Sequence, residues 1–173
     1  MTGARAELDH LLDEFSMGRL PSIGFVRRVK ELRDADPGLV SPDPSLGTAV
    51  VVGFGRHTAG RDIMSLLLEI LGFAVRNVQV TGGDTEAVEA CQGPGVTALC
   101  LSAQSTEGAN GAMDIIREVD DTAARSRIVV CAGGSSFSAA QAEKAGCDVF
   151  TGSAVDSARA VRDAVRSRKG PLA

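Results

Sequence analysis

The sequence predicts an α/β protein built on a five-stranded parallel sheet and preceded by a short helical extension. From Thr48 onward, short runs rich in β-branched residues alternate with longer amphipathic runs. Such alternation is typical of parallel strands covered by helices on both faces. The chain has 173 residues and is 44% hydrophobic, which is enough for one domain that buries roughly 70% of its unfolded surface.

The first part of the chain predicts two helices and a linker. Residues 5–16 and residues 24–33 each carry apolar side chains at helical spacing, and Pro21 separates the two runs. Prolines and glycine then interrupt both helix and strand patterns over residues 35–46. We therefore expect a helical extension at 1–34, a linker at 35–46 and an α/β domain at 47–168.

The rest of the chain predicts five strands, each followed by a helix. The expected strands are 49–52, 73–78, 96–101, 128–131 and 149–150. The expected helices are 63–71, 85–91, 112–119, 138–145 and 155–165. Because crossovers between parallel strands are right-handed, this pattern predicts a flavodoxin-like (Rossmann-like) sheet with the order 2-1-3-4-5.

Composition and charge disfavour several classes of function. The net charge is −4 and only 3% of the residues are aromatic, so we expect no nucleic-acid binding, which needs basic and stacking side chains. The first residues contain no apolar leader and no apolar stretch is long enough for a bilayer. Cys91, Cys100, Cys131 and Cys147 form no Cys-x-x-Cys pair. We expect a cytoplasmic protein with reduced cysteines and no membrane association.

The loop after the first strand contains the first candidate site residue, His57. In a sheet of this order, ligands bind at the carboxyl ends of the first and third strands, where the strand order reverses. His57 and Gly60 lie in that loop. The loop matches neither a dinucleotide fingerprint nor a P-loop. A solvated side chain with no ligand is the alternative interpretation of His57.

The loops after the third and fourth strands contain small polar residues and glycines. Ser102 directly follows a buried strand, and an amide and further hydroxyls come after it. Ser105 or Thr106 could instead cap the next helix. The paired Gly133 and Gly134 remove side chains beside the predicted cleft, although a permissive turn needs glycines as well.

Together the three loops resemble the cobalamin-binding domain family, which includes methionine-synthase-type and corrinoid protein modules. The family signature is Asp-x-His-x-x-Gly, then Ser-x-Leu or a variant, then Gly-Gly. The matching positions are His57 with Gly60, Ser102, and Gly133 with Gly134. Residues 60–63 also resemble the Gly-Lys-Asn-Ile of corrinoid proteins, and residues 102–106 resemble Ser-Ala-x-x-Thr. The resemblance covers about residues 47–167.

The resemblance implies that the chain binds methylcobalamin or adenosylcobalamin in the base-off, His-on mode. His57 would replace the cofactor's own base as the lower ligand of cobalt, and the displaced nucleotide tail would enter the cleft. The residues implied to contact the cofactor are Gly55, Arg56, His57, Thr58, Ala59, Gly60, Ser102, Ala103, Gln104, Thr106, Gly133 and Gly134.

One position departs from the family signature. Gly55 stands where the family has the aspartate that holds the ligand histidine. Losing such a partner commonly costs about 10–100-fold in metal affinity or activity. The outcomes left open are weaker histidine ligation, a substitute group from elsewhere, and loss of His-on binding.

The first hypothesis that the resemblance implies is a cobalamin-carrying subunit with no catalytic residue of its own. Methyltransferase-type corrinoid proteins usually have a longer helical bundle over cobalt than two helices can form. We therefore expect this chain to present the corrinoid to a separate catalytic protein, for methyl transfer or a radical rearrangement. A cobalamin-dependent regulatory or sensory module and a cofactor-free interaction domain are the alternatives. Self-association, the reaction and the upper ligand stay open.

Overall fold

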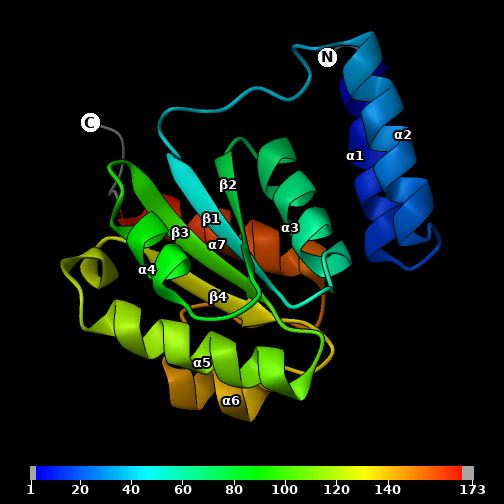
Figure 1. Ribbon diagram of the computed structural model, residues 1–173. Coiled ribbons are helices and arrows are strands. Elements are labelled where there is room, and N and C mark those ends of the chain that lie inside the picture. Colours follow the sequence, from blue (N-terminus) through cyan, green and yellow to red (C-terminus); the bar gives the residue numbers. More distant parts are fainter. Residues whose placement is uncertain (1–2, 169–173) are drawn as a thin grey trace.

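The computed structural model describes residues 3–168. Within them the chain forms one parallel sheet of four strands in the order β2-β1-β3-β4 (Figure 1). The strands are β1 (Thr48–Phe54), β2 (Ala74–Val80), β3 (Val96–Ser102) and β4 (Val129–Gly133). The order reverses between β1 and β3, as the sequence predicts.

Helices precede the sheet and connect its strands. The first two, before the sheet, are α1 (Gly3–Ser16) and α2 (Ser22–Ala35). The others are α3 (Ala59–Ile70), α4 (Thr85–Gln92), α5 (Thr106–Asp120), α6 (Ala139–Ala145) and α7 (Ala154–Arg168), with a short 3-10 turn at Ala123–Ser126. In Figure 1, α3 and α7 lie on one side of the sheet, and α4, α5 and α6 lie on the other.

Alternating side chains of the central strands supply two apolar cores, one on each face. On β1, Ala49 and Val51 join the core beneath α3 and α7, whereas Val50 and Val52 join the core beneath α4 and α5. Strands β3 and β4 alternate in the same way, since successive side chains of a strand point to opposite faces. This double burial explains why the strands are almost continuous apolar runs.

The prediction of a fifth strand at 149–150 is wrong. Val149 makes only an isolated bridge to Cys131 on the outer edge of β4. Asp148 is the physical reason. Its carboxylate accepts a hydrogen bond from the Val130 backbone N–H at 2.7 Å, while the Val130 carbonyl accepts from the N–H groups of Asp148 and Val149. A side chain therefore takes the place of a ladder of backbone bonds, and the chain turns away after Phe150.

The two N-terminal helices pack against the α3 and α7 side of the sheet. The Phe15 and Phe25 rings stack with centroids 4.4 Å apart. The buried residues of α1 and α2 belong to the same core as those of α3 and α7. In the connecting segment at 36–47, which contains neither helix nor strand, Leu46 is fully buried. Residues 1–2 of the predicted extension lie outside the described part of the chain.

None of the helices within residues 3–168 combines the length and the apolar character that crossing a membrane requires.

Candidate functional site

The loop with His57 leaves the end of β1 and leads directly into α3. Gly55 adopts a left-handed backbone conformation with φ of 62°, and the His57 backbone N–H donates to the Phe54 carbonyl at 3.3 Å. Helix α3 begins at Ala59, which fixes how far the loop extends. The side chain of His57 is exposed. The turn therefore presents an accessible imidazole at the carboxyl edge of the sheet.

Gln79 of β2 holds this loop through its backbone. The Gln79 side-chain N–H donates to the Gly55 carbonyl at 2.8 Å, and Arg61 donates to the Gln79 side-chain oxygen at 2.9 Å. Arg61 also pairs with Asp62 at 2.7 Å. Asp62 is thus engaged by Arg61. The loop is anchored at Gly55, the position where the family signature has a carboxylate.

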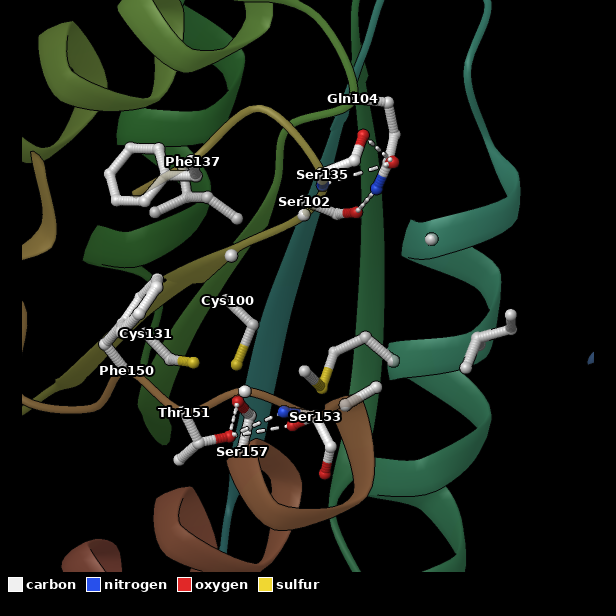
Figure 2. Close-up of a pocket in the computed structure, with 18 of the residues that line it drawn as sticks. Cys100, Ser102, Gln104, Cys131, Ser135, Phe137, Phe150, Thr151, Ser153 and Ser157 are labelled. Atoms are coloured by element: carbon white, nitrogen blue, oxygen red, sulfur yellow. Dashed lines mark hydrogen bonds between the residues drawn. The ribbon is translucent and has the colours of Figure 1, made fainter. Parts of the chain in front are cut away.

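A cavity of about 530 Å³ opens at the carboxyl edge of the sheet, between β3, β4 and the starts of α3 and α7. Figure 2 shows Gln104, Ser102 and Ser135 together at one end, with Thr151, Ser153 and Ser157 at the other. The remaining lining residues are Phe15, Ser22, Gly60, Ile63, Met64, Cys100, Leu101, Cys131, Gly133, Gly134, Phe137, Phe150, Gly152 and Ala154. The wall is therefore apolar along most of its length and polar at its two ends.

The far polar end is built around the start of α7. The Thr151 hydroxyl donates to the Ser153 carbonyl at 2.8 Å and lies 2.8 Å from the Ser157 hydroxyl. The Ser153 hydroxyl accepts from the Asp156 backbone N–H at 3.1 Å, which caps the helix. The first turn of α7 therefore faces the cavity.

A second, open hollow lies beside the cavity and contains His57 with the start of α3. It is lined by Arg56, His57, Thr58, Ala59, Gly60, Ile63, Gln104 and Ser135. Four of these residues, Gly60, Ile63, Gln104 and Ser135, also line the cavity. They form the boundary between the two spaces, so the imidazole hollow and the cavity are neighbours.

The paired glycines of the fourth loop have different structural roles. A Cβ at Gly133 would meet no atom within 4 Å, and strand alternation places Gly133 on the same face as Cys131, which lines the cavity. A Cβ at Gly134, by contrast, would lie 2.1 Å from the Ala103 carbonyl oxygen, and φ there is 109°. Gly133 therefore leaves space in the cavity, whereas Gly134 allows two loops to touch.

Most of the sequence-predicted site residues gather around the hollow and the cavity, but Gly55, Ala103 and Thr106 do not line either space. Ala103 is fully buried behind Gly134. Thr106 is exposed at the first position of α5. The neighbouring Ser105 is the helix cap, because its hydroxyl accepts from the Gly108 N–H at 3.0 Å. Gly55 lines a separate pocket that His57 shares, formed with the end of β2 and the first turns of α5.

Sequence reasoning missed the polar residues that follow β4 and the fifth-strand segment. Ser135 bonds to Gln104, and Thr151, Ser153 and Ser157 form the far end of the cavity. The signal was available in the pattern, since residues 151–153 follow the carboxyl end of the expected fifth strand. Ligands bind beyond the carboxyl ends of the strands in such sheets, and this rule covers the residues after the expected fifth strand as well as those after the first and third.

Two thiols face each other inside the cavity. Cys100 and Cys131 are register partners on β3 and β4, and their sulfur atoms lie side by side in Figure 2. Their mutual hydrogen bond, together with burial, raises the pKa of the Cys100 thiol well above its ordinary value. Because the thiolate is the nucleophile and metal ligand, Cys100 behaves as an inert apolar group at neutral pH.

Burial of two other thiols makes the protein sensitive to alkaline pH. Burial raises the pKa of Cys91 to about 12 and that of Cys147 to about 11, from 9.0. Above pH ~8.5 an unfolded chain loses these thiol protons while the folded chain keeps them. The free energy of unfolding should therefore fall as pH rises above 9, as measured by urea titration. Removing both thiols with Cys91→Ala and Cys147→Ala should make this slope smaller, with the part due to Cys100 remaining, and an unchanged slope would contradict the assignment.

Comparison with known proteins connects this architecture to solved structures. No protein-family model matches the sequence, and no curated protein matches it. Among solved structures, a cobalamin-binding protein from Desulfitobacterium hafniense DCB-2 superposes with a TM-score of 0.71 at 17% identity, over 90% of this chain and 76% of that one. The chain has the fold of cobalamin-binding proteins.

Two further structures share this fold. The monomethylamine corrinoid protein of Methanosarcina barkeri matches with a TM-score of 0.64 at 20% identity, over 82% of this chain and 68% of that one. The methanol:cobalamin methyltransferase complex MtaBC from the same organism matches with a TM-score of 0.64 at 17% identity, over 98% of this chain and 66% of the matched chain. The chain thus spans roughly two thirds to three quarters of each matched chain.

Proposed function

We propose that the chain binds a cobalamin through His57, in the base-off form, and carries it for a separate catalytic protein that performs methyl transfer or a radical rearrangement. The observation that supports this most is the pairing of an exposed imidazole with a cavity beside it, at the carboxyl edge of the sheet. The likeness to solved cobalamin-binding and corrinoid proteins adds to it.

The residues present fit the nucleotide tail of such a cofactor. A volume of about 530 Å³ lies in the range of about 300–1,000 Å³ that small-molecule sites occupy. Apolar residues such as Met64 and Phe137 suit an aromatic base, and the hydroxyls at each end suit a ribose and a phosphodiester. The start of α7 adds a partial positive charge that favours a phosphate group. Gly133 leaves room where a side chain would block the tail.

His57 would suit the role of cobalt ligand because a neutral imidazole is a good donor to transition metals. When bound, cobalamin supplies a cobalt–carbon bond that can be made and broken. No group of three or more metal-ligating side chains exists within residues 3–168. A corrinoid would need only one protein ligand, since its macrocycle supplies four nitrogen ligands and a further ligand is its own methyl, adenosyl or hydroxo group. Gln79 would keep His57 in place through the Gly55 carbonyl.

A separate partner is proposed because this chain leaves His57 uncovered. Residues 55–59 are all exposed, so no segment within the described residues lies over the imidazole. Helices α1 and α2 stand beside α3, and of their residues Phe15 and Ser22 reach the cavity wall. A protein that performs chemistry on the cofactor would therefore find it accessible from outside.

Binding and visible spectroscopy test the proposal directly. The purified protein should retain hydroxocobalamin, methylcobalamin or adenosylcobalamin through desalting, with the spectrum of a nitrogen ligand from protein. His57→Ala should shift that spectrum and weaken retention, whereas His10→Ala, at the other histidine, should change neither. Colourless protein with all three cobalamins would overturn the proposal.

The same experiment separates a carrier from a regulatory module. The regulatory module is the second candidate because Gly55 stands where the family signature has a carboxylate, and a carrier that binds its cofactor tightly would be expected to have that group. Retention of methylcobalamin without any response to light supports carriage. Retention of adenosylcobalamin alone, with a change of oligomeric state on illumination measured by light scattering, supports regulation instead.

A further inference from the structure

The side chain of Gln104 stands at the boundary between the His57 hollow and the cavity. It lines both spaces, and in Figure 2 it lies at one end of the cavity, with Thr151, Ser153 and Ser157 at the opposite end. A ligand tail that starts near His57 and ends near Thr151 must therefore pass Gln104. Among residues 3–168, no other amide side chain lines either space.

The carboxamide of Gln104, on the loop after β3, is held there by bonds to the end of β3 and to the loop after β4. Its N–H donates at 3.2 Å to the hydroxyl of Ser102, the last residue of β3. Its oxygen accepts from the Ser135 hydroxyl at 2.9 Å and from the Ser135 backbone N–H at 3.5 Å, on the loop after β4. The amide thus ties the loops after β3 and β4 together across the boundary.

The third side of this boundary is the backbone of α3. A Cβ at Gly60 would lie 2.3 Å from the Ser102 hydroxyl oxygen and 2.7 Å from the Gln104 side-chain nitrogen. Gln104 and Ser102 therefore pack directly against the first turn of α3. The amide is therefore enclosed by the end of β3, the loop after β4 and the first turn of α3, at the boundary between the hollow and the cavity.

We propose that Gln104 is a gate residue that closes the passage between the His57 hollow and the cavity in the free protein, and that it must swing aside before a nucleotide tail enters. This inference rests on the proposed function, because it concerns how the tail of a base-off cobalamin reaches the cavity. It makes Gln104 a determinant of the rate of binding for corrinoids that have a tail.

The size of the effect follows from the bonds that opening breaks. The two shorter bonds, with the Ser102 and Ser135 hydroxyls, are neutral and contribute together about 1–3 kcal/mol. This corresponds to roughly a fivefold to 150-fold excess of the closed arrangement. Gln104→Ala removes both bonds and the bulk of the side chain. Uptake of a tailed corrinoid should then accelerate by about tenfold, the lower part of that range. Ser135→Ala removes one bond and should give a smaller acceleration.

Stopped-flow binding with two corrinoids tests the gate. Hydroxocobalamin has a nucleotide tail, whereas cobinamide lacks it and has no need to pass Gln104. Gln104→Ala should accelerate uptake of hydroxocobalamin and leave the rate with cobinamide within about twofold of the wild-type rate, a difference near the few tenths of a kcal/mol typical of neutral surface changes. Gln92→Ala, at an exposed glutamine on the last turn of α4, serves as the matched control and should change neither rate.

The outcomes test the gate at Gln104 and the proposed binding of cobalamin separately. An unchanged or slower uptake of hydroxocobalamin by Gln104→Ala would overturn the gate, since slower uptake means that Gln104 binds the tail and does not block it. Equal acceleration with both corrinoids would also overturn it. Wild-type protein that binds neither corrinoid would contradict the proposed function itself. Should Gln104→Ala fail to fold, as judged by circular dichroism, the Ser135→Ala rates with the two corrinoids decide the question.

Discussion

Replacing Gly134 with alanine is expected to destabilise the folded protein by about 2–5 kcal/mol, because it combines backbone strain with overpacking. The new Cβ would lie 2.1 Å from the Ala103 carbonyl oxygen and within 2.8 Å of two further backbone atoms of Ala103. Backbone atoms in a paired loop cannot move aside as a flexible side chain can. The positive φ at Gly134 adds strain for any residue with a Cβ.

The urea midpoint of unfolding measures this loss, which is large against the usual stability of about 5–15 kcal/mol. Gly133→Ala is the matched control, since the added Cβ meets nothing and should change stability by no more than about 0.5–1 kcal/mol. Equal midpoints for Gly134→Ala and the wild type would mean that the loops after β3 and β4 do not touch as described.

The second large effect is expected from Gly133→Leu, which should weaken the binding of cobalamin while leaving the fold intact. Gly133 lies on the cavity face of β4 with open space beside it. A leucine side chain there projects into the cavity and takes up room proposed for the nucleotide tail. Forcing a ligand against an extra side chain commonly costs about 1–3 kcal/mol, which means a loss in affinity of roughly 5–150-fold.

Equilibrium titration followed by visible absorbance measures this loss, and urea unfolding of the same variant shows whether the fold has changed. Gly133→Ala should reduce affinity less than Gly133→Leu, because a methyl group occupies less of the cavity. Cobinamide, which has no tail, should bind Gly133→Leu and the wild type alike. Undiminished affinity of Gly133→Leu for hydroxocobalamin would show that the tail does not enter this cavity.

Helix boundaries show where sequence patterns end and tertiary contacts take over. The sequence predicts the fifth helical run at 112–119, whereas α5 begins at Thr106. Its first turns contain Gly108 and Gly111, which lower helix propensity. A Cβ at either glycine would lie 3.1 Å from the Phe54 side chain, so the glycines let α5 approach the end of β1. The two glycines therefore conceal the start of the helix from sequence analysis, and they also allow the contact with Phe54 that places the helix beside the site.

The candidate site was partly predictable for a similar reason. His57 follows β1, while Ser102 and Gly133 are the last residues of β3 and β4. The order of these strands is evident from the alternation of runs, and the structure brings the three residues to one edge of the sheet. The bond between Ser135 and Gln104 was not predictable, because the two residues are 31 positions apart and neither belongs to a recognisable spacing. Their meeting depends on how two loops bend after leaving β3 and β4.

The sequence by itself determined the parallel sheet, its first four strands and the edge at which polar loops gather, because these follow from local apolar patterns and the handedness of crossovers. Only the tertiary structure decided that the fifth segment ends as a bridge, that Gly133 and Gly134 differ in role, and that Gln104 lies between two spaces. Those features depend on contacts between residues distant in the chain, such as the Asp148 carboxylate on the Val130 N–H. A local sequence pattern does not specify which residue from a distant part of the chain will contact a given backbone group.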